Sequence, residues 1–103
     1  MTHGDLVNDV LLFLSPLGMA WANNTGALRD HTQRLVRYGL PGSSDVLACI
    51  GSRFVAVECK VGADRQRKNQ ADFAAAIRKA GGVYVLARSV DDVRNTLTVE
   101  GVI

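Results

Sequence analysis

Two apolar runs on either side of Gly51-Ser52 constrain what this chain can fold into more than any other feature. The runs cover residues 45–50 and 54–60. Short apolar runs separated by a Gly-Ser pair are typical of a β-hairpin closed by a tight two-residue turn. Because side chains alternate between the two faces of a strand, such a turn also fixes which residues of the two strands lie opposite each other.

The expected register of this hairpin brings charged side chains together. If Ile50 pairs with Arg53, Asp45 lies directly opposite Glu58. Lys60 follows Glu58 by two residues and therefore shares its face. Turn geometry alone thus predicts a cluster of two carboxylates and one ammonium group.

The rest of the chain alternates between helical and strand patterns. Apolar spacing and turn residues predict helices over 5–14 and 65–80, a last helix capped by Ser89, and strands over 19–22, 83–87 and 98–103. The run at 83–87 is apolar throughout, which favours a central strand covered on both faces. Residues 27–40 are polar and basic and show no clean period. This order predicts an α/β fold, a single domain over residues 1–103 in which helices flank a mixed sheet.

Charge is distributed unevenly along the chain. The formal net charge is +2, and residues 29–79 hold ten of the 12 Lys and Arg residues but only five of the 10 acidic ones. A positive central region is compatible with a polyanion such as nucleic acid as the partner, but on this feature alone a solvated surface of uneven charge is the favoured interpretation. No apolar run approaches the roughly 20 residues of a membrane helix, so we expect a soluble cytoplasmic protein with no membrane partner.

Asp45 and Glu58 are candidate ligands of a divalent metal ion. Two converging carboxylates can hold a hard cation through oxygen, and Mg²⁺ completes its shell with water and substrate phosphate. Such a metal lowers the pKa of a bound water and neutralises charge on a phosphodiester. Lys60 could orient that water or stabilise the charge that develops. Gln70, from the next helix, could position the water or Lys60, and the main-chain carbonyl of Cys59 could supply another oxygen.

The alternative interpretation is a purely structural ion cluster on a solvated sheet face. Like charges directly opposite each other destabilise a sheet, however, and burying them unpaired costs more. Alternation also puts Phe54 and Ala56 on the carboxylate face, so that face is not simply exposed to solvent. These considerations favour a metal site over the structural cluster.

Further segments complete a resemblance to a nuclease family. The segments that carry it are, in chain order, Asn23-Asn24-Thr25-Gly26-Ala27, Tyr38-Gly39-Leu40-Pro41-Gly42, Ser43-Ser44-Asp45, Glu58-Cys59-Lys60, Gln70 and Gly81-Gly82. Together they resemble the PD-(D/E)XK nuclease superfamily and, more narrowly, the virus-type replication-repair nuclease (VRR-NUC) domain, over nearly the whole chain. The resemblance implies a restriction-endonuclease-like αβββαβ core and hydrolysis of phosphodiester bonds at one Mg²⁺ or Mn²⁺ site.

The resemblance also implies roles for individual residues. By motif position, Asp45 and Glu58 would be metal ligands, Lys60 the catalytic lysine and Gln70 the family's helix glutamine. These four residues are the candidate catalytic set.

Two positions depart from the family's pattern. Members usually carry a Glu in the first helix that supports the metal shell, and counting back from Gly18 puts that place at or near His3, with Asp5 close by. His3 could bind the metal, Asp5 could supply the carboxylate, or the position could be dispensable; a frayed chain end is the structural alternative. Ala22 stands where an Arg often precedes the Asn-Thr-Gly run, which leaves one phosphate contact of the family without a counterpart.

The resemblance also suggests that basic and polar residues near the proposed site bind DNA. The candidate DNA-binding residues are Asn24, Thr25, Arg29, Arg34, Arg37, Arg65, Arg67 and Lys68. Arg29, Arg34 and Arg37 precede the Pro-Gly turn, and the other three basic residues open the second predicted helix. Contacts with backbone phosphates would fix the position of DNA without reading bases. Surface solubility is the alternative role for each arginine.

The expected function is that of a metal-dependent DNA endonuclease. Stand-alone members of the family are small, are often encoded by phages, and resemble Holliday-junction resolvases that act as homodimers. The resemblance therefore implies structure-selective cleavage of branched or flapped DNA by a homodimer in a bacterial or phage-infected cell. The alternative is a non-catalytic nucleic-acid-binding or assembly module that retains the nuclease fold, because the first-helix Glu is missing. A sequence-specific restriction-like nuclease is disfavoured, since 103 residues leave little room for a base-reading insertion.

Overall fold

The hairpin around Gly51-Ser52 lies at the centre of the computed structural model, which describes residues 1–103. Its strands are β4 (Val46–Ile50) and β5 (Arg53–Cys59), and Ile50 pairs with Arg53 as the sequence predicts. Both turn residues have positive φ, 55° for Gly51 and 65° for Ser52. A primed turn needs this conformation at both central positions, and it suits the twist of the two strands.

The hairpin belongs to a mixed four-stranded sheet with the strand order β1-β4-β5-β6. β1 (Met19–Ala22) runs antiparallel to β4, and β6 (Val83–Ala87) runs parallel to β5. The expectation of a central position for 83–87 is wrong, because β6 is an edge strand of this sheet. The expected cover on both faces is confirmed, and it accounts for the continuous apolar sequence: α2 (Lys68–Lys79) packs on one face of β6 and α3 (Val90–Val99) on the other.

The helices begin close to where the sequence predicts. α1 (His3–Leu14) starts two residues earlier than expected, because Thr2 and Asp5 form a capping box in which each side chain accepts a hydrogen bond from the other's main-chain N–H. α2 starts three residues later than expected, at Lys68, and α3 is capped as predicted by the Ser89 hydroxyl. None of the helices has the length and apolar character that crossing a membrane requires.

The strand expected over 98–103 is absent. α3 continues to Val99, and Gly101 then adopts a φ of 73°. The N–H groups of Val102 and Ile103 donate to the Leu97 carbonyl. The chain end thus folds back on the last turn of the helix, in the manner of a glycine-terminated helix, instead of extending along the sheet.

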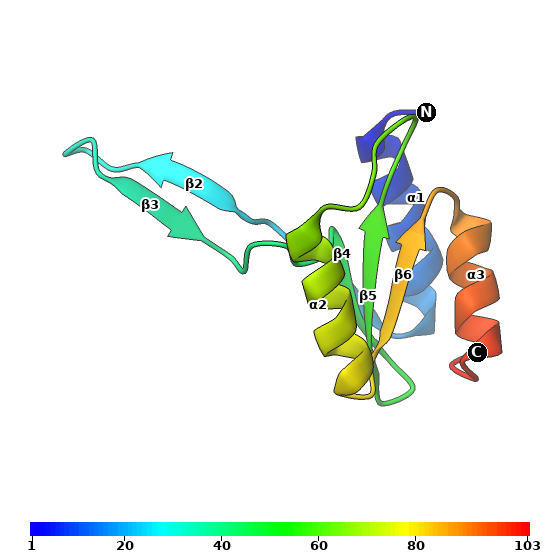
Figure 1. The fold of residues 1–103 in the computed structure, drawn as a ribbon. Coiled ribbons are helices and arrows are strands. Elements are labelled where there is room, and N and C mark those ends of the chain that lie inside the picture. Colours follow the sequence, from blue (N-terminus) through cyan, green and yellow to red (C-terminus); the bar gives the residue numbers. More distant parts are fainter.

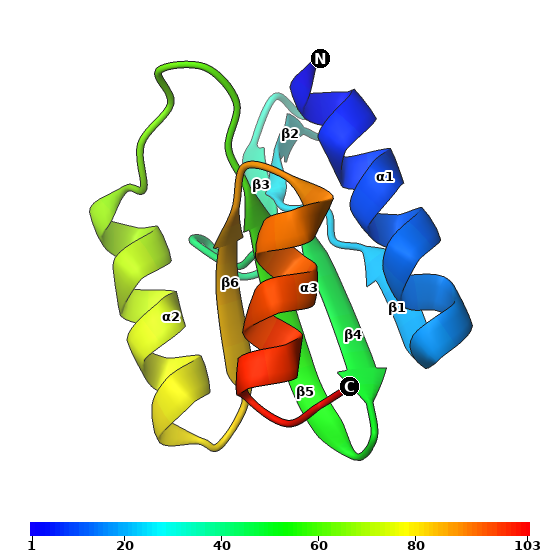
Figure 2. The ribbon, with the colours of Figure 1, turned by 90° about the vertical axis from the view of Figure 1, so that its right-hand side faces the viewer.

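The core has two parts because helices lie on both faces of the sheet. α1 and α3 cover one face, in front of the strands in Figure 2, and α2 lies on the other (Figures 1 and 2). The larger cluster of buried side chains, which includes Leu6, Val57 and Leu97, fills the space beneath α1 and α3. A smaller cluster around Ala56 and Tyr84 lies beneath α2. This is the α/β fold with flanked mixed sheet that the sequence predicts.

Residues 27–40, for which the sequence predicts no element, contribute most of a two-stranded antiparallel ribbon. Its strands are β2 (Gly26–Arg29) and β3 (Leu35–Tyr38), and every residue of both is exposed. Figure 1 shows the ribbon projecting away from the sheet and its helices. A ribbon that packs no face on the domain has no need of alternating apolar residues, which explains why the pattern is missing.

Candidate functional site

The structure brings Asp45, Glu58, Lys60 and Gln70 together where β5 ends. Asp45 directly precedes β4, Glu58 is the penultimate residue of β5, and Lys60 follows that strand. Gln70 is the third residue of α2, the helix that connects β5 to β6. The hairpin register and the parallel crossover thus position the four side chains that the sequence singles out.

Gln70 links Glu58 to Lys60 through both ends of its carboxamide. Its Nε2 donates to Glu58 Oε1 at 3.0 Å, and its Oε1 accepts from Lys60 Nζ at 2.9 Å. Gln70 Oε1 also accepts from the main-chain N–H of Arg67 at 2.9 Å, at the start of the helix. Lys60 Nζ lies 3.5 Å from Glu58 Oε1, and both side chains are buried. These bonds hold the carboxamide in one orientation and the ammonium group in one place.

Asp45 is held by the main chain of the opposite strand. Its Oδ2 accepts a hydrogen bond of 2.8 Å from Cys59 N. The Cys59 side chain points to the other face of the sheet and belongs to the larger core cluster. Burial raises the pKa of the Cys59 thiol to about 12, so this thiol stays protonated near neutral pH and is a poor metal ligand there. Any contribution of Cys59 to a metal site would therefore come from its main chain, as the sequence interpretation expects.

Glu58 is the least compensated group of the cluster. Its Oε1 has a partner, but its buried Oε2 has none. Burial and, second, the neighbouring Asp45 carboxylate raise the pKa of Glu58 from 4.5 to about 7, although Lys60 opposes the shift. The two carboxylates are close together, and one of their buried oxygens has no partner. The single ammonium group of Lys60 therefore does not compensate the negative charge of both.

The donor set fits a hard divalent cation better than a soft one. The unpartnered Glu58 Oε2 lies in the same cluster as Asp45, so a cation there would give this oxygen a partner and relieve the repulsion between the carboxylates. No three His, Cys, Asp or Glu side chains form a metal-binding group. A metal held by Asp45 and Glu58 would therefore need main-chain oxygen, water or substrate as further ligands, as Mg²⁺ commonly does.

Of the two N-terminal candidates, only His3 contacts the cluster. His3 is the first residue of α1, and its Nε2 lies 3.2 Å from Asp45 Oδ2. The Asp5 carboxylate instead accepts a hydrogen bond from Thr2 N in the capping box. His3, Asp45 and Asn24 line a cavity of about 280 Å³.

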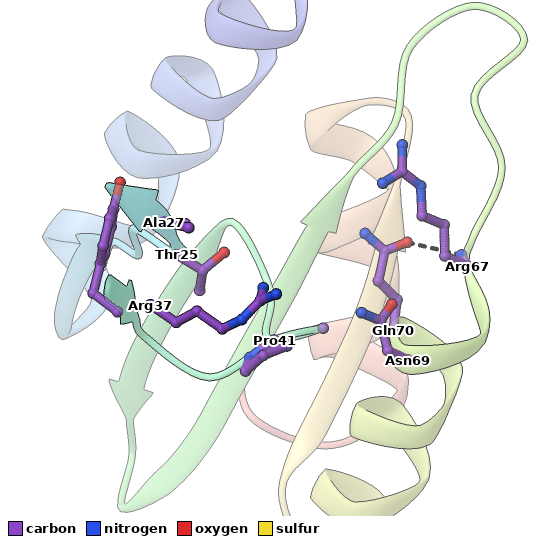
Figure 3. Close-up of a pocket in the computed structure, with 10 residues that line it drawn as sticks. Thr25, Ala27, Arg37, Pro41, Arg67, Asn69 and Gln70 are labelled. Carbon is purple, nitrogen blue, oxygen red and sulfur yellow. Dashed lines mark hydrogen bonds between the residues drawn. The ribbon is translucent and has the colours of Figure 1, made fainter. Parts of the chain in front are cut away.

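A second cavity, of about 340 Å³, opens between the base of the ribbon and the start of α2 (Figure 3). Its lining residues are Thr25, Gly26, Ala27, Arg37, Tyr38, Pro41, Gly42, Arg67, Asn69 and Gln70. Figure 3 shows Arg37 reaching from the ribbon toward α2, with Arg67 on the far side of Gln70. Since Gln70 also bonds Glu58 and Lys60, this polar and positively charged cavity adjoins the carboxylate cluster.

Glycine at position 42 allows the two sides of this cavity to meet. Gly42 has a φ of 84°, and a Cβ atom there would lie 2.5 Å from the carbonyl oxygen of Asn69. A side chain at this position would thus be strained and would push the turn away from the first turn of α2. The Pro41-Gly42 segment, which contributes to the family resemblance, therefore has a packing role.

The candidate DNA-binding residues divide into two groups. Thr25, Arg37 and Arg67 line the cavity beside α2, and Asn24 lines the cavity beside α1. Four others line neither cavity: Arg29 and Arg34 on the ribbon, Arg65 in the loop before α2, and Lys68, which pairs with Asp72. Arg65 and Arg67 precede α2 and do not belong to it, contrary to expectation, because the helix begins at Lys68.

Asn23 supports the site in a way that the sequence did not indicate. Its Nδ2 donates to Ser43 Oγ at 2.7 Å and to the Ser44 carbonyl at 2.9 Å, and its main-chain N–H donates to the Asp45 carbonyl. These bonds fasten the end of β1 to the turn that carries Asp45. Asn23 lies in a segment quoted for the resemblance, but its partners are some 20 residues away, so no local pattern identifies this role.

Comparison of the chain with protein-family models and with curated proteins finds no match.

Proposed function

We infer that this protein is a metal-dependent DNA endonuclease that hydrolyses phosphodiester bonds. One observation carries the proposal: a buried carboxylate with an unpartnered oxygen, a second carboxylate and a buried lysine share one cluster, and an arginine-lined cavity adjoins it. Charge repulsion makes this arrangement costly for stability alone. It is well suited to a divalent cation and an anionic substrate.

The order of the elements supports a restriction-endonuclease-like core. With the ribbon set aside, the chain runs α1, β1, β4, β5, α2 and β6, followed by α3. This αβββαβ order is the one that the resemblance to the VRR-NUC domain implies. The proposal assigns the chain to that type of nuclease core.

Asp45 and Glu58 would hold one Mg²⁺ or Mn²⁺ ion, with the main-chain carbonyl of Cys59 as a further candidate ligand; His3 contacts Asp45 but does not complete a three-side-chain group with it and Glu58. When bound, such an ion lowers the pKa of a coordinated water and neutralises charge on the phosphate. The protein's own groups do the positioning. The Asp45 carboxylate is fixed by Cys59 N, and Glu58 Oε1 is fixed by Gln70.

Lys60 would act on the reacting phosphate. Its ammonium group is buried and held by Gln70, so it is preorganised to donate to a phosphate oxygen or to the attacking water. In the reaction, the water oxygen bonds to phosphorus and loses a proton to solvent. The bond from phosphorus to the leaving oxygen breaks, and that oxygen takes up a proton from water. Gln70 is a positioning residue in this scheme.

The two arginines of the larger cavity would hold the DNA backbone. Arg37 and Arg67 come from opposite walls, and contacts of this kind place a strand without reading its bases. Such recognition suits the structure-selective cleavage of branched or flapped DNA by a homodimer that the resemblance implies. Thr25 and Asn24 would add neutral contacts.

A non-catalytic nucleic-acid-binding or assembly module is the second candidate function. It is favoured by one observation: the position expected to carry a first-helix Glu is taken by His3, and no third acidic side chain joins the cluster. In such a module, Lys60 and Gln70 would only neutralise Glu58. The two functions differ in whether DNA is cut.

The test is a cleavage assay on linear, flapped and four-way DNA with Mg²⁺ or Mn²⁺. We expect Lys60→Ala to reduce cleavage by about 10²-fold or more, and Lys79→Ala, at the exposed far end of α2, to leave it unchanged. Calorimetric titration with Mn²⁺ should detect binding to the wild type and none to Asp45→Ala. Cleavage by Lys60→Ala at the wild-type rate would refute the proposal. DNA binding by the wild type without any cutting would establish the non-catalytic module.

A further inference from the structure

The two faces of the β2–β3 ribbon differ in chemistry. Residues paired across the strands share a face, so Leu28 and Val36 lie together with Tyr38 on one side. Arg29 and Arg37 lie on the other side together with Ala27 and Leu35, and of these Ala27 and Arg37 line the cavity next to α2. One face of the ribbon is thus apolar, whereas the other carries both arginines. The cavity is lined by residues from the base of both faces, Gly26 and Tyr38 as well as Ala27 and Arg37.

A second apolar surface lies on the sheet itself. Met19, Cys49 and Phe54 form one cross-strand row over β1, β4 and β5, and Trp21 lies on the same face of β1. α2 packs on β6 and leaves the β1–β4 half of this face bare. Met19, Cys49, Trp21 and Phe54 are all exposed. We call the surface formed by these four residues the bare sheet face.

The ribbon and the bare sheet face lie on the same side of the molecule. Figure 1 shows the ribbon projecting on the side of the sheet that carries α2, opposite α1 and α3. The bare sheet face belongs to that side, because its residues share the face of the sheet with the cluster beneath α2. Each chain thus carries its apolar arm and its apolar platform on one side of the molecule, so two copies related by a twofold axis can exchange these contacts.

The apolar area that would be buried determines which pairing of these surfaces is large enough for a stable dimer. The three apolar side chains of the ribbon are exposed by 65%, 45% and 43%, or together roughly 300 Å². Packing two ribbons together would bury only about 600 Å², well below the roughly 1,200 Å² of a stable interface. Met19, Trp21 and Phe54, exposed by 70%, 40% and 38%, double the area per chain. A ribbon on a platform, formed twice, therefore reaches about 1,200 Å² in total.

The stability of the ribbon also requires a packing partner. A two-stranded ribbon that packs on nothing is at best marginally stable in water. Nucleic acid does not fit the apolar face, because Leu28, Val36 and Tyr38 bring no positive charge to it. A second copy offers a surface of matching chemistry.

We propose that the β2–β3 ribbon is a dimerisation arm whose apolar face packs on the bare sheet face of a second copy, with the exchange made in both directions. This arrangement leaves the face that carries Arg29 and Arg37 uncovered by the second copy. The inference rests on the proposed function only for the expectation of a homodimer.

Cys49 makes the contact testable by cross-linking. It is an exposed free thiol on the bare sheet face, whereas Cys59 is buried. Under mild oxidation, Leu28→Cys should form a covalent dimer through Cys49 of the partner subunit, detected on a non-reducing gel. That dimer should disappear when Cys49→Ser is added. A covalent dimer that persists without Cys49 would mean that ribbon packs on ribbon and would overturn the proposal.

Sedimentation provides a second measurement that involves no cleavage. The wild type should sediment as a dimer, and both the Leu28→Lys/Val36→Lys variant and the Trp21→Lys variant should sediment as monomers. Leu12→Lys, an exposed leucine on α1 at the opposite face of the sheet, should remain dimeric. A monomeric wild type, or a dimeric Leu28→Lys/Val36→Lys variant, would refute the arm. Either result would leave the nuclease proposal standing, because cleavage is measured separately.

Discussion

Gln70 connects more of the site than any other side chain. One carboxamide bonds Glu58 Oε1, Lys60 Nζ and the main-chain N–H of Arg67, the N-cap residue of α2, at the same time. Glutamine suits this place because it offers a donor and an acceptor without adding charge. Its role is to hold charged groups in position, so its loss should affect turnover more than binding.

We predict that Gln70→Ala lowers kcat by about 10²-fold, since small displacements of reacting groups have effects of this size. KM for DNA should change little, because the arginines of the cavity remain. Asn69→Ala is the matched control: this neighbouring amide lines the cavity but does not bond Glu58 or Lys60. Equal losses of kcat in both variants would contradict the assignment of Gln70.

The buried Glu58 carboxyl makes stability depend on pH in the metal-free protein. Its pKa is raised from 4.5 to about 7, first by burial and then by Asp45. The folded state therefore holds this proton more tightly than the unfolded state, and the free energy of unfolding should fall as pH rises through about 5 to 7. The total effect is at most roughly 3 kcal/mol.

Thermal unfolding at several pH values tests this prediction. Glu58→Gln should remove the decline in Tm, because its amide has no proton to lose in this range. Mg²⁺ should raise the Tm of the wild type more at about pH 8 than at about pH 6, where it competes with the proton. An identical pH dependence in the Glu58→Gln variant would show that another group is responsible.

At the scale of elements, the turn before β4 positions both the site and the ribbon. Gly42 abuts the first turn of α2, and the bonds from Asn23 fix the same turn from the side of β1. Gly42→Ala should destabilise the protein by about 1–3 kcal/mol, because it combines a positive φ with a clash against main chain. Gly62→Ala is the matched control, since Gly62 has a φ of 58° but open space around it. Urea unfolding measures both; a control variant as unstable as Gly42→Ala would show that the contact with Asn69 contributes nothing.

The sequence predicts elements best where local rules determine them. The tight turn at Gly51-Ser52 is sufficient to set the register of β4 and β5, and with it the positions of Asp45 and Glu58. The ribbon escapes prediction because its strands pack on no core. The expected strand over 98–103 fails because α3 continues to Val99 and Gly101, with a φ of 73°, then turns the chain end back onto the helix.

Contacts between distant segments are the part of the site that the sequence leaves open. His3 could be weighed against Asp5 only by family position, whereas their surroundings separate them: His3 contacts Asp45 and Asp5 caps a helix. No spacing rule joins His3 to a residue 42 positions away, or Arg37 of the ribbon to Arg67 before α2. The first pair follows from the start of α1 lying beside the turn before β4, and the second from how the base of the ribbon meets α2.

At the scale of the whole molecule, charge and apolar surface are separated. Arg37 of the ribbon and Arg67 before α2 line the larger cavity, whereas Leu28 and Val36 lie on the opposite face of the ribbon from Arg37 and line neither cavity. One side of the arm is thus available to a polyanion and the other to a second copy. A dimer built through the apolar side would present two basic cavities at once, which suits a branched substrate better than a single duplex.

The last prediction concerns the salt dependence of DNA binding, measured by fluorescence anisotropy in EDTA so that nothing is cut. Each phosphate that a protein neutralises adds roughly one to the slope of log K against log salt. Arg37→Ala/Arg67→Ala should therefore weaken binding at low salt and make that slope shallower by about two. Lys79→Ala, which removes a positive charge at the other end of α2, should alter neither. Equal effects in the two variants would mean that net charge attracts DNA without a defined path. A selective effect would place the backbone in the cavity beside Gln70, within reach of the buried lysine.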